Sequence, residues 1–338
     1  MKLDYSALHQ PVTASDISAY KQSLHRQSRP VLQVTSVVVM AIFILSVVFG
    51  IQLASSGSIQ SGNFGFAAMM LGFFGFIVGI AIIATRIQTK KLAKLYKFAT
   101  QNNLKLKAGV SSPGYAGTIF DEGHSRMIDQ ALSFPDGSEI GNYQYTTGSG
   151  KSTQVHLWTY ARAPLKRQLP NMLLDSKHNN LFGTFTSLPN SMKSNQVLSL
   201  EGDFDKHFTL YAPVAYKTDA LYIFTPDVMA AIIDAGKDYD MEIIGNELFL
   251  YRSQTVRIDS EQELTKILTI LGKISTELLD QTDYYADKRV GDRGQDVIAQ
   301  PGQRLKQRMN PLAITLVAIF LFITFAPMLI GMLVRQLG

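Results

Sequence analysis

The chain of 338 residues contains no cysteine. A protein without cysteine forms no disulfide, and it has neither a thiolate nucleophile nor a cysteine-ligated metal. Its six histidines include no HExxH motif and no pair at the spacing of helical metal ligands. We therefore expect neither a metal nor a cofactor. The lack of cysteine is also consistent with a reducing compartment.

Charged residues are missing from three long stretches, residues 31–54, 64–85 and 312–334. At about 1.5 Å per residue, each stretch is long enough to cross a hydrocarbon core of about 30 Å. Three buried helices of a soluble protein are the alternative, but core helices rarely exceed about 20 residues without a polar face. The first stretch follows mostly polar residues and precedes no small-residue cleavage site, so it is predicted to be an anchor. The sequence therefore predicts three transmembrane α-helices, two N-terminal and one C-terminal.

Basic residues beside these stretches predict the orientation. Lys and Arg precede the first stretch, follow the second and precede the third, whereas residues 55–63 carry no charge. Because cytoplasmic loops are enriched in Lys and Arg, the N-terminus and the central region are predicted to be cytoplasmic and the C-terminus outside. The cations predicted to lie at the membrane surface are Arg86, Lys90, Lys91, Lys94 and Lys97, and, before the third stretch, Arg304, Lys306 and Arg308.

The lipid bilayer is thus a predicted partner. The sequence leaves open whether the flanking cations recognise anionic lipid headgroups or only set the topology. They account for most of the formal net charge of +5. Nucleic-acid binding would favour basic residues interleaved with aromatic residues on the central region, and the sequence shows no such patch, so no nucleic-acid partner is expected.

Residues 86–285 are predicted to form a cytoplasmic α+β domain with a mostly antiparallel sheet. A basic juxtamembrane helix continues from the second span, with Leu92, Leu95 and Phe98 on the face opposite the lysines. Polar and apolar side chains alternate through residues 154–162, which is typical of a strand.

Local signals predict further elements of this domain. Thr225 and Pro226 indicate the start of a helix that stops at Gly236. Gly245 with its neighbour Asn246 predicts a hairpin of two strands. A capping box at residues 260–263 begins another helix. The apolar residues of this last helix follow at spacings of three and four: Leu264, Ile267, Leu271, Ile274 and Leu278.

Five segments follow from these patterns. They are a cytoplasmic N-terminal segment (1–30), a transmembrane helical hairpin (31–85), the cytoplasmic α+β domain (86–285), a flexible tether (286–310) and a C-terminal transmembrane helix (311–338). The tether is predicted because this stretch is charged, has few apolar positions and contains several glycines and a proline.

Residues 148–152, with the sequence GSGKS, match the end of a phosphate-binding P-loop. The complete motif requires a glycine where this chain has Tyr145, and it should open a helix, whereas an alternating strand follows. A glycine-rich turn between strands 139–145 and 154–162 explains the same residues, so we expect a hairpin turn and no nucleotide site.

Catalytic signals are weak. Asp175 with His178, and the acids of residues 201–205, are predicted to be turn and cap residues. A catalytic site would have to be assembled across the fold, for example from His124, Asp175 and His178. The sequence therefore predicts no catalytic residue.

Two runs of sequence resemble a known family. Residues 200–204 (LEGDF), then Phe208 and Tyr211, and then residues 220–229 (ALYIFTPDVM) resemble the signature of an uncharacterised bacterial membrane-protein family with a domain of unknown function. Shorter similar pieces lie at Phe98, Ala99 and Asn103, at residues 123–126 and at residues 169–175. The resemblance covers roughly residues 95–255. It implies a bacterial inner membrane, paired N-terminal spans and a soluble α+β part, with no catalytic residues to transfer, and some members look like neighbours of the LemA family.

Three functional hypotheses remain open. The first is a membrane-anchored cytoplasmic module that binds a protein partner or serves as a scaffold in the cell envelope, with a homo-oligomer possible. The second is a membrane-associated enzyme of the hydrolase type. The third, a channel or transporter subunit, has the least support, because no ionisable residue lies inside a predicted span.

Overall fold

The computed structural model describes residues 3–26, 61–179, 186–190, 192–291 and 296–307. The chain divides into two compact units, which are described separately. The first, here called the helical unit, comprises Met1–Gly109, Gln130–Pro135 and Arg257–Thr265. The second, called the sheet unit, comprises Val110–Asp129, Asp136–Val256 and Lys266–Gly338.

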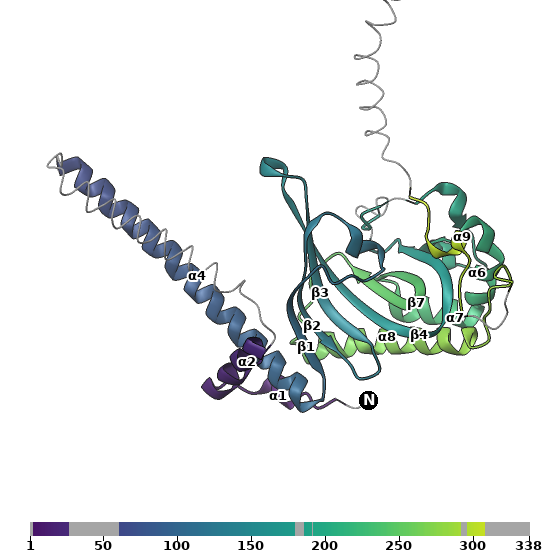
Figure 1. The fold of residues 1–338 in the computed structure, drawn as a ribbon, viewed down its shortest axis with the longest axis horizontal. Helices are drawn as coiled ribbons and strands as arrows, with labels where there is room; N and C mark the ends of the chain where they lie inside the picture. The colour runs from purple at the N-terminus through teal and green to yellow at the C-terminus, as the bar shows by residue number, and fades with distance from the viewer. Residues whose placement is uncertain (1–2, 27–60, 180–185, 191, 292–295, 308–338) are drawn as a thin grey trace, which may run out of the picture. The chain divides into compact units, whose positions relative to one another are not determined.

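The helical unit is built around one long helix, α4 (Ser61–Gln101), which has 41 residues. At about 1.5 Å per residue, α4 is about 60 Å long (Figure 1). Its last turns bury Leu92, Leu95 and Phe98, which confirms the apolar face predicted for this part of the chain. The helix is therefore continuous from the predicted second span into the folded part of the unit.

Two short N-terminal helices, α1 (Ser6–His9) and α2 (Ala14–Arg26), pack on the end of α4. The Tyr5 ring stacks on Phe98, and the Tyr20 ring lies 6.0 Å from Tyr96. Asp16 forms an ion pair with Lys97 at 3.5 Å. From Tyr5 to Tyr20, the ring partners on α4 move from Phe98 to Tyr96, so both N-terminal helices pack on the C-terminal end of α4.

A seven-stranded sheet has the order β1-β2-β3-β4-β6-β5, and β7 pairs with β4. The pairings of β4 with β3, β6 and β7, and of β5 with β6, are antiparallel. The predicted α+β class with a mostly antiparallel sheet is confirmed. The strands are β1 (Lys105–Ser111), β2 (His124–Ser133), β3 (Glu139–Thr147), β4 (Gln154–Ser176), β5 (Val197–Leu198), β6 (Phe208–Tyr211) and β7 (Asp240–Arg252).

The hairpin predicted around Gly245 is wrong. Residues 240–252 form one strand, β7, that pairs with β4 on both sides of Gly245. Gly245 has a φ of +58° and lies opposite Leu169, where the register between β4 and β7 shifts. A glycine with positive φ serves a β-bulge as well as a turn. The long partner strand β4 selects the bulge.

The helices of the sheet unit agree better with their sequence signals. Helix α7 (Pro226–Gly236) begins at the predicted proline and ends at the predicted glycine. Helix α8 (Glu261–Thr282), whose first residues belong to the helical unit, buries all five of its predicted apolar residues. Shorter helices are α5 (Phe204–His207), α6 (Lys217–Ile223) and α9 (Gln300–Gln303), with 3-10 turns at η1 (Thr118–Asp121), η2 (Gly150–Ser152), η3 (Ser194–Gln196) and η4 (Val214–Tyr216).

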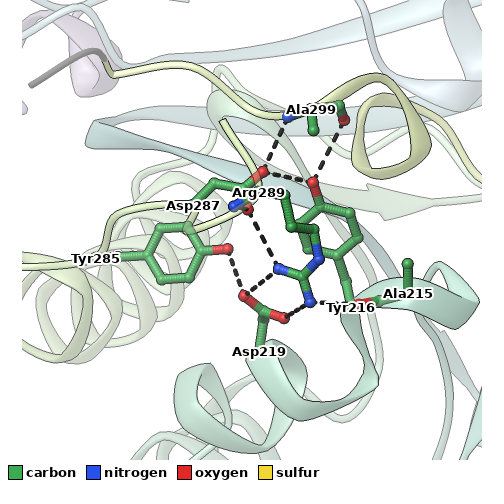
Figure 2. A network of polar contacts seen from close by, with 7 residues as sticks. All are labelled: Ala215, Tyr216, Asp219, Tyr285, Asp287, Arg289 and Ala299. Carbon is green, nitrogen blue, oxygen red and sulfur yellow. Dashed lines mark hydrogen bonds and ion pairs between the residues drawn. The ribbon is translucent and has the colours of Figure 1, made fainter. Parts of the chain in front are cut away.

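The segment predicted to be a flexible tether is attached to the sheet unit wherever the structure describes it. The carboxylate of Asp287 accepts hydrogen bonds from the Tyr216 hydroxyl at 2.5 Å and from the Ala299 backbone N–H at 2.9 Å (Figure 2). Arg289 forms ion pairs with Asp287 at 3.2 Å and with Asp219 at 2.8 Å. The sequence does not reveal these contacts, because Tyr216 and Asp219 lie about seventy positions away along the chain.

The Asp287–Arg289 network also shifts the pKa values of its members. Burial of Asp287 opposes its ionisation, but hydrogen bonds from Tyr216 and from the backbone of Ala299 and Arg289 outweigh burial and lower its pKa. Hydrogen bonding to Asp219 raises the pKa of Arg289. Both groups are therefore charged at neutral pH, and the network links the segment just after α8 to Tyr216, Asp219 and Ala299.

Among the described residues, one helix is long and apolar enough to cross a membrane. It is the Gly72–Gln101 part of α4, and none of its most apolar window is buried. The predicted first and third spans, residues 31–54 and 312–334, lie outside the described residues.

Candidate functional site

The predicted membrane-surface cations of α4 occupy different environments. Arg86 and Lys90 are exposed, whereas Lys91 and Lys94 are half-buried. Lys97, the last of the five, has its own acidic partner in Asp16. Lys97 therefore has an acidic partner, whereas the side chains of the other four cations form no hydrogen bond or ion pair with the other described residues.

The cations before the predicted third span are engaged differently. The Arg304 guanidinium donates to the carbonyl oxygen of Ala116 at 2.7 Å and lies 3.6 Å from Asp121. Lys306 has an exposed side chain, and its backbone pairs with Gln196. Arg308 lies outside the described residues. Contact of these three residues with a membrane stays a prediction.

The GSGKS sequence forms a turn. Strands β3 and β4 pair from Glu139 opposite Arg162 to Thr147 opposite Gln154, and residues 148–153 join them. Gly148 and Gly150 have φ values of +73° and +56°, which explains why glycines stand there. A strand, and not a helix, follows the turn, so the predicted hairpin is confirmed and no P-loop geometry is present in these residues.

The three residues considered for a hydrolase site do not come together. His124 begins β2, and its Nε2 atom lies 3.0 Å from the carbonyl oxygen of Gly148, close to the first residues of β4. Asp175 lies at the other end of the 23-residue strand β4, followed by His178. The structure separates His124 from the other two.

A polar cluster does form at the end of β4 where Asp175 lies. We call it the β4 polar end, and its members are Asp175, Ser176, His178, Ser187, His207 and Asp240. Leu174 of β4 pairs with Met241 of β7 and with Leu210 of β6, so the adjoining residues of three strands meet here. Strand pairing therefore assembles the cluster from segments that are distant in sequence.

Asp240 is the most deeply buried acid of this cluster, with a relative exposure of 0%. Its carboxylate accepts hydrogen bonds from the Ser176 backbone N–H at 2.8 Å and from the Ser187 hydroxyl at 2.7 Å. Burial raises the pKa of Asp240 to about 7, and the nearby charge of Asp175 acts in the same direction. An acid that titrates near neutral pH meets one requirement of general acid–base catalysis.

Two histidines lie at the same end of the sheet. His178 Nε2 and His207 Nδ1 are 3.0 Å apart, and their rings are stacked with centroids 5.3 Å apart. His207 Nε2 lies 3.8 Å from a carboxylate oxygen of Asp203. In the described part of the chain, no group of three or more His, Cys, Asp or Glu residues has the geometry to hold a metal ion.

A second buried acid, Glu242, provides a contrast with Asp240. Glu242 accepts hydrogen bonds from the Thr118 backbone N–H, the Asn171 amide and the Tyr251 hydroxyl at 2.7, 2.9 and 3.0 Å. Burial raises its pKa, and the three donors oppose the shift. These donors tie η1, β4 and β7 together, which indicates a structural role.

Sequence reasoning missed Asp240, Ser187 and His207. Asp240 precedes an apolar strand, and nothing in the local sequence distinguishes it from other acids at strand ends. His207 and His178 are 29 positions apart. Only the pairing of β4, β6 and β7 shows that these residues are neighbours.

The fold and these sites define a class: an α+β protein with a mostly antiparallel sheet and one described helix of membrane-spanning length and composition. No family model matches the chain, and no curated protein matches it. The chain is similar to the crystal structure of the mycobacterial trehalose monomycolate transport factor A, TtfA, with a TM-score of 0.35 and 8% sequence identity over 52% of this chain and 87% of that chain. This degree of similarity assigns neither fold nor function, and the resemblance to a bacterial membrane-protein family stays a prediction.

Proposed function

We propose that the chain is a membrane-anchored module of the bacterial cell envelope whose α+β part faces the cytoplasm and binds a protein partner. The observation that carries the membrane anchor is α4. Seven large apolar residues between Phe73 and Ile87 are each 45–66% exposed; six of them share one broad face, and Ile82 lies on the opposite one. No charged residue lies between positions 64 and 85, and none of the most apolar window is buried, so this part of the helix is apolar all round. A helix that is apolar all round requires an apolar environment, which a bilayer provides.

The proposal includes three spans. The packing of α2 on the C-terminal end of α4 supports a hairpin, because a chain that leaves α2 and returns through the whole of α4 would cross the bilayer twice. The composition of residues 312–334 supports the third span. The cations of residues 86–97 support a cytoplasmic position for the parts that follow.

The topology can be tested directly because the chain has no cysteine. Single variants Ser149→Cys, in the exposed turn between β3 and β4, and Gln336→Cys would be treated with a membrane-impermeant maleimide on intact spheroplasts. We expect labelling of Gln336→Cys on intact cells and of Ser149→Cys only after lysis. Labelling of Ser149→Cys on intact cells would contradict the proposed orientation, and extraction of the chain by alkaline carbonate would contradict the anchor.

An apolar patch on the sheet unit supports a protein partner. Leu221 and Tyr222 of α6 are 52% and 45% exposed, and Tyr284, just after α8, is 87% exposed. The Gln281 amide donates to the carbonyl oxygen of Tyr222 at 2.6 Å, so the two segments are neighbours. Neighbouring exposed apolar residues are typical of interaction surfaces.

Site-specific photocrosslinking tests this patch. A benzoylphenylalanine would replace Leu221 or Tyr284 in the full chain in native membranes, with the exposed residue Lys193 as the control position. We expect a discrete adduct from the first two positions and none from Lys193. An adduct of twice the chain mass would identify a second copy as the partner. A solitary monomer at all three positions would contradict partner binding.

The β4 polar end supports a second candidate, a membrane-associated hydrolase. The observation in its favour is Asp240, whose pKa lies near 7 beside Ser187 and close to two histidines. The purified chain would be assayed with nitrophenyl esters and phosphates, comparing Asp240→Asn with Asp283→Asn, an exposed acid, as the control. Loss of turnover in Asp240→Asn alone would favour an enzyme, and absence of turnover in the unaltered chain would reject it for these substrates.

A further inference from the structure

All the charge of α4 lies in a short region. The helix contains five basic residues and no acidic residue over its 41 residues. The basic residues fall between positions 86 and 97, and exposed apolar residues, among them Ile80 and Ile83 at 51% and 59% exposure, lie at their N-terminal side. The charged region therefore begins where the apolar surface ends.

Three of these cations form a row along the helix. Arg86, Lys90 and Lys94 follow at four-residue spacing and so share one face, with Lys91 beside them. Like charges at this spacing destabilise a helix. These four side chains form no hydrogen bond or ion pair with the other described residues. We call Arg86, Lys90, Lys91 and Lys94 the cationic face. An anion from outside the described chain would offset the repulsion among these charges.

Lys97 shows the opposite arrangement. Its ammonium lies 3.5 Å from Asp16, and the pKa of Asp16 is lowered first by the backbone N–H of Thr13 and further by Lys97. Lys97 lies about 18 Å beyond the end of the predicted span, whereas Lys90 and Lys91 lie within about 9 Å of it. Electrostatic attraction to a membrane surface falls off over a Debye length of about 8 Å. The distant lysine thus has a partner within the protein, and the nearer cations do not.

From this geometry we infer that the cationic face binds the phosphate groups of anionic phospholipids in the adjacent leaflet. The inference rests on the proposed insertion of α4 in the membrane. Ammonium and guanidinium groups donate charge-assisted hydrogen bonds to phosphate oxygens. An anionic lipid carries a net negative charge, whereas the choline of a zwitterionic lipid neutralises its phosphate, so the cationic face discriminates in favour of anionic lipids.

Native mass spectrometry of the full chain in detergent micelles tests the inference. Dioleoylphosphatidylglycerol and dioleoylphosphatidylcholine would be titrated separately, and inorganic phosphate would show whether a free anion suffices. Each cation near a membrane surface contributes about fivefold in affinity for anionic lipid. We expect phosphatidylglycerol to bind at least about fivefold more tightly than phosphatidylcholine, with no retention of inorganic phosphate.

Variants identify the residues responsible. Lys90→Gln, Lys91→Gln and Lys94→Gln together should weaken the preference at least about fivefold, whereas the three Lys→Arg substitutions should keep it. The matched control combines Lys193→Gln, Lys206→Gln and Lys237→Gln, which removes the same charge from exposed sites of the sheet unit. Lys97→Gln should also keep the preference, because its partner is Asp16.

The outcomes separate this inference from the proposed function. Equal binding of the two lipids by the unaltered chain, or an equal loss in the matched control, overturns the lipid preference while the membrane anchor stands. Retention of inorganic phosphate as strongly as phosphatidylglycerol also overturns it, since a free anion would then suffice. Extraction of the chain by alkaline carbonate overturns the anchor itself, independently of any lipid titration.

Discussion

Helices α4 and α8 are the two longest helices of the described chain, and they place their apolar residues in opposite environments. Helix α8 buries apolar side chains at spacings of three and four, and its exposed side chains are polar. Helix α4 exposes large apolar side chains between Phe73 and Ile87 and buries no residue there, then buries one face near its C-terminus. The pattern of apolar residues, more than their number, therefore indicates whether protein or lipid surrounds a helix.

The same contrast holds for charged residues. Four of the five cations of helix α4 have no partner among the other described residues and follow directly after the predicted span. The sheet unit instead buries acids such as Asp240, whose pKa burial raises to about 7, and Asp287, whose hydrogen bonds lower its pKa. Substitutions can measure how each environment affects the free energy of unfolding and the insertion into the membrane.

The largest expected effect on stability is at the buried face of α8. Ile274 has a relative exposure of 0%, and Ile274→Ala should lower the free energy of unfolding by about 2–5 kcal/mol through lost burial and a cavity. Urea unfolding of the full chain in detergent can be followed by the fluorescence of Trp158, the single tryptophan. Phe76→Ala on α4 is the control and should leave this transition unchanged. If Ile274→Ala and Phe76→Ala shifted the urea transition equally, the contrast between the two helices would be contradicted.

A charge placed on α4 should affect membrane insertion. Phe76→Arg puts a cation within the predicted span, at a cost of about 3 kcal/mol near the bilayer centre. The fraction of chain that resists carbonate extraction should fall. Thr276→Arg, on an exposed position of α8, is the matched control and should insert normally. A normal carbonate-resistant fraction for Phe76→Arg would place this part of α4 outside the bilayer.

Asp240 predicts a dependence of stability on pH. Because its pKa is about 4 in the unfolded chain and about 7 in the folded one, the folded state binds more protons between these values. Its contribution to stability is present at low pH and is lost as the pH rises towards 7, by up to about 1.4 kcal/mol per pH unit.

Asp240→Asn should remove this slope. Urea unfolding at several pH values between 4.5 and 7.5 would compare it with the unaltered chain, and Asp283→Asn, an exposed acid, would serve as the control. The variant should gain stability relative to the unaltered chain as the pH rises. Parallel pH profiles for the three proteins would show that Asp240 is ionised at neutral pH.

Two glycines should show the smallest effects, with opposite signs. Gly272 is exposed within α8, and a Cβ there would meet no atom within 4 Å, so Gly272→Ala should stabilise the fold by up to about 1 kcal/mol. Gly245 also has open space but a φ of +58°, so Gly245→Ala should destabilise it by about 1 kcal/mol. Urea unfolding followed by Trp158 measures both. Stabilisation by Gly245→Ala would contradict the left-handed backbone conformation of Gly245.

Local signals predicted those elements that depend on a few adjacent residues. The proline and glycine that bound α7, the capping box of α8 and the glycines of the GSGKS turn each act within one or two turns of chain. The bulge at Gly245 has the same local signal as a hairpin, and the sequence alone predicted the wrong one. The Asp287–Arg289 network was not predicted, and of the β4 polar end the sequence singled out only Asp175 and His178, because each group joins side chains from separate segments.

The sequence by itself determined the uncharged stretch within α4, its cationic end and the class of the fold, because composition and periodicity act through solvent and need no distant partner. The tertiary structure decided that residues 286–291 and 296–307 attach to the sheet unit and that Asp240 meets Ser187. Those outcomes depend on which strands pair and on how deeply a polar group is buried, and both are properties of the assembled chain.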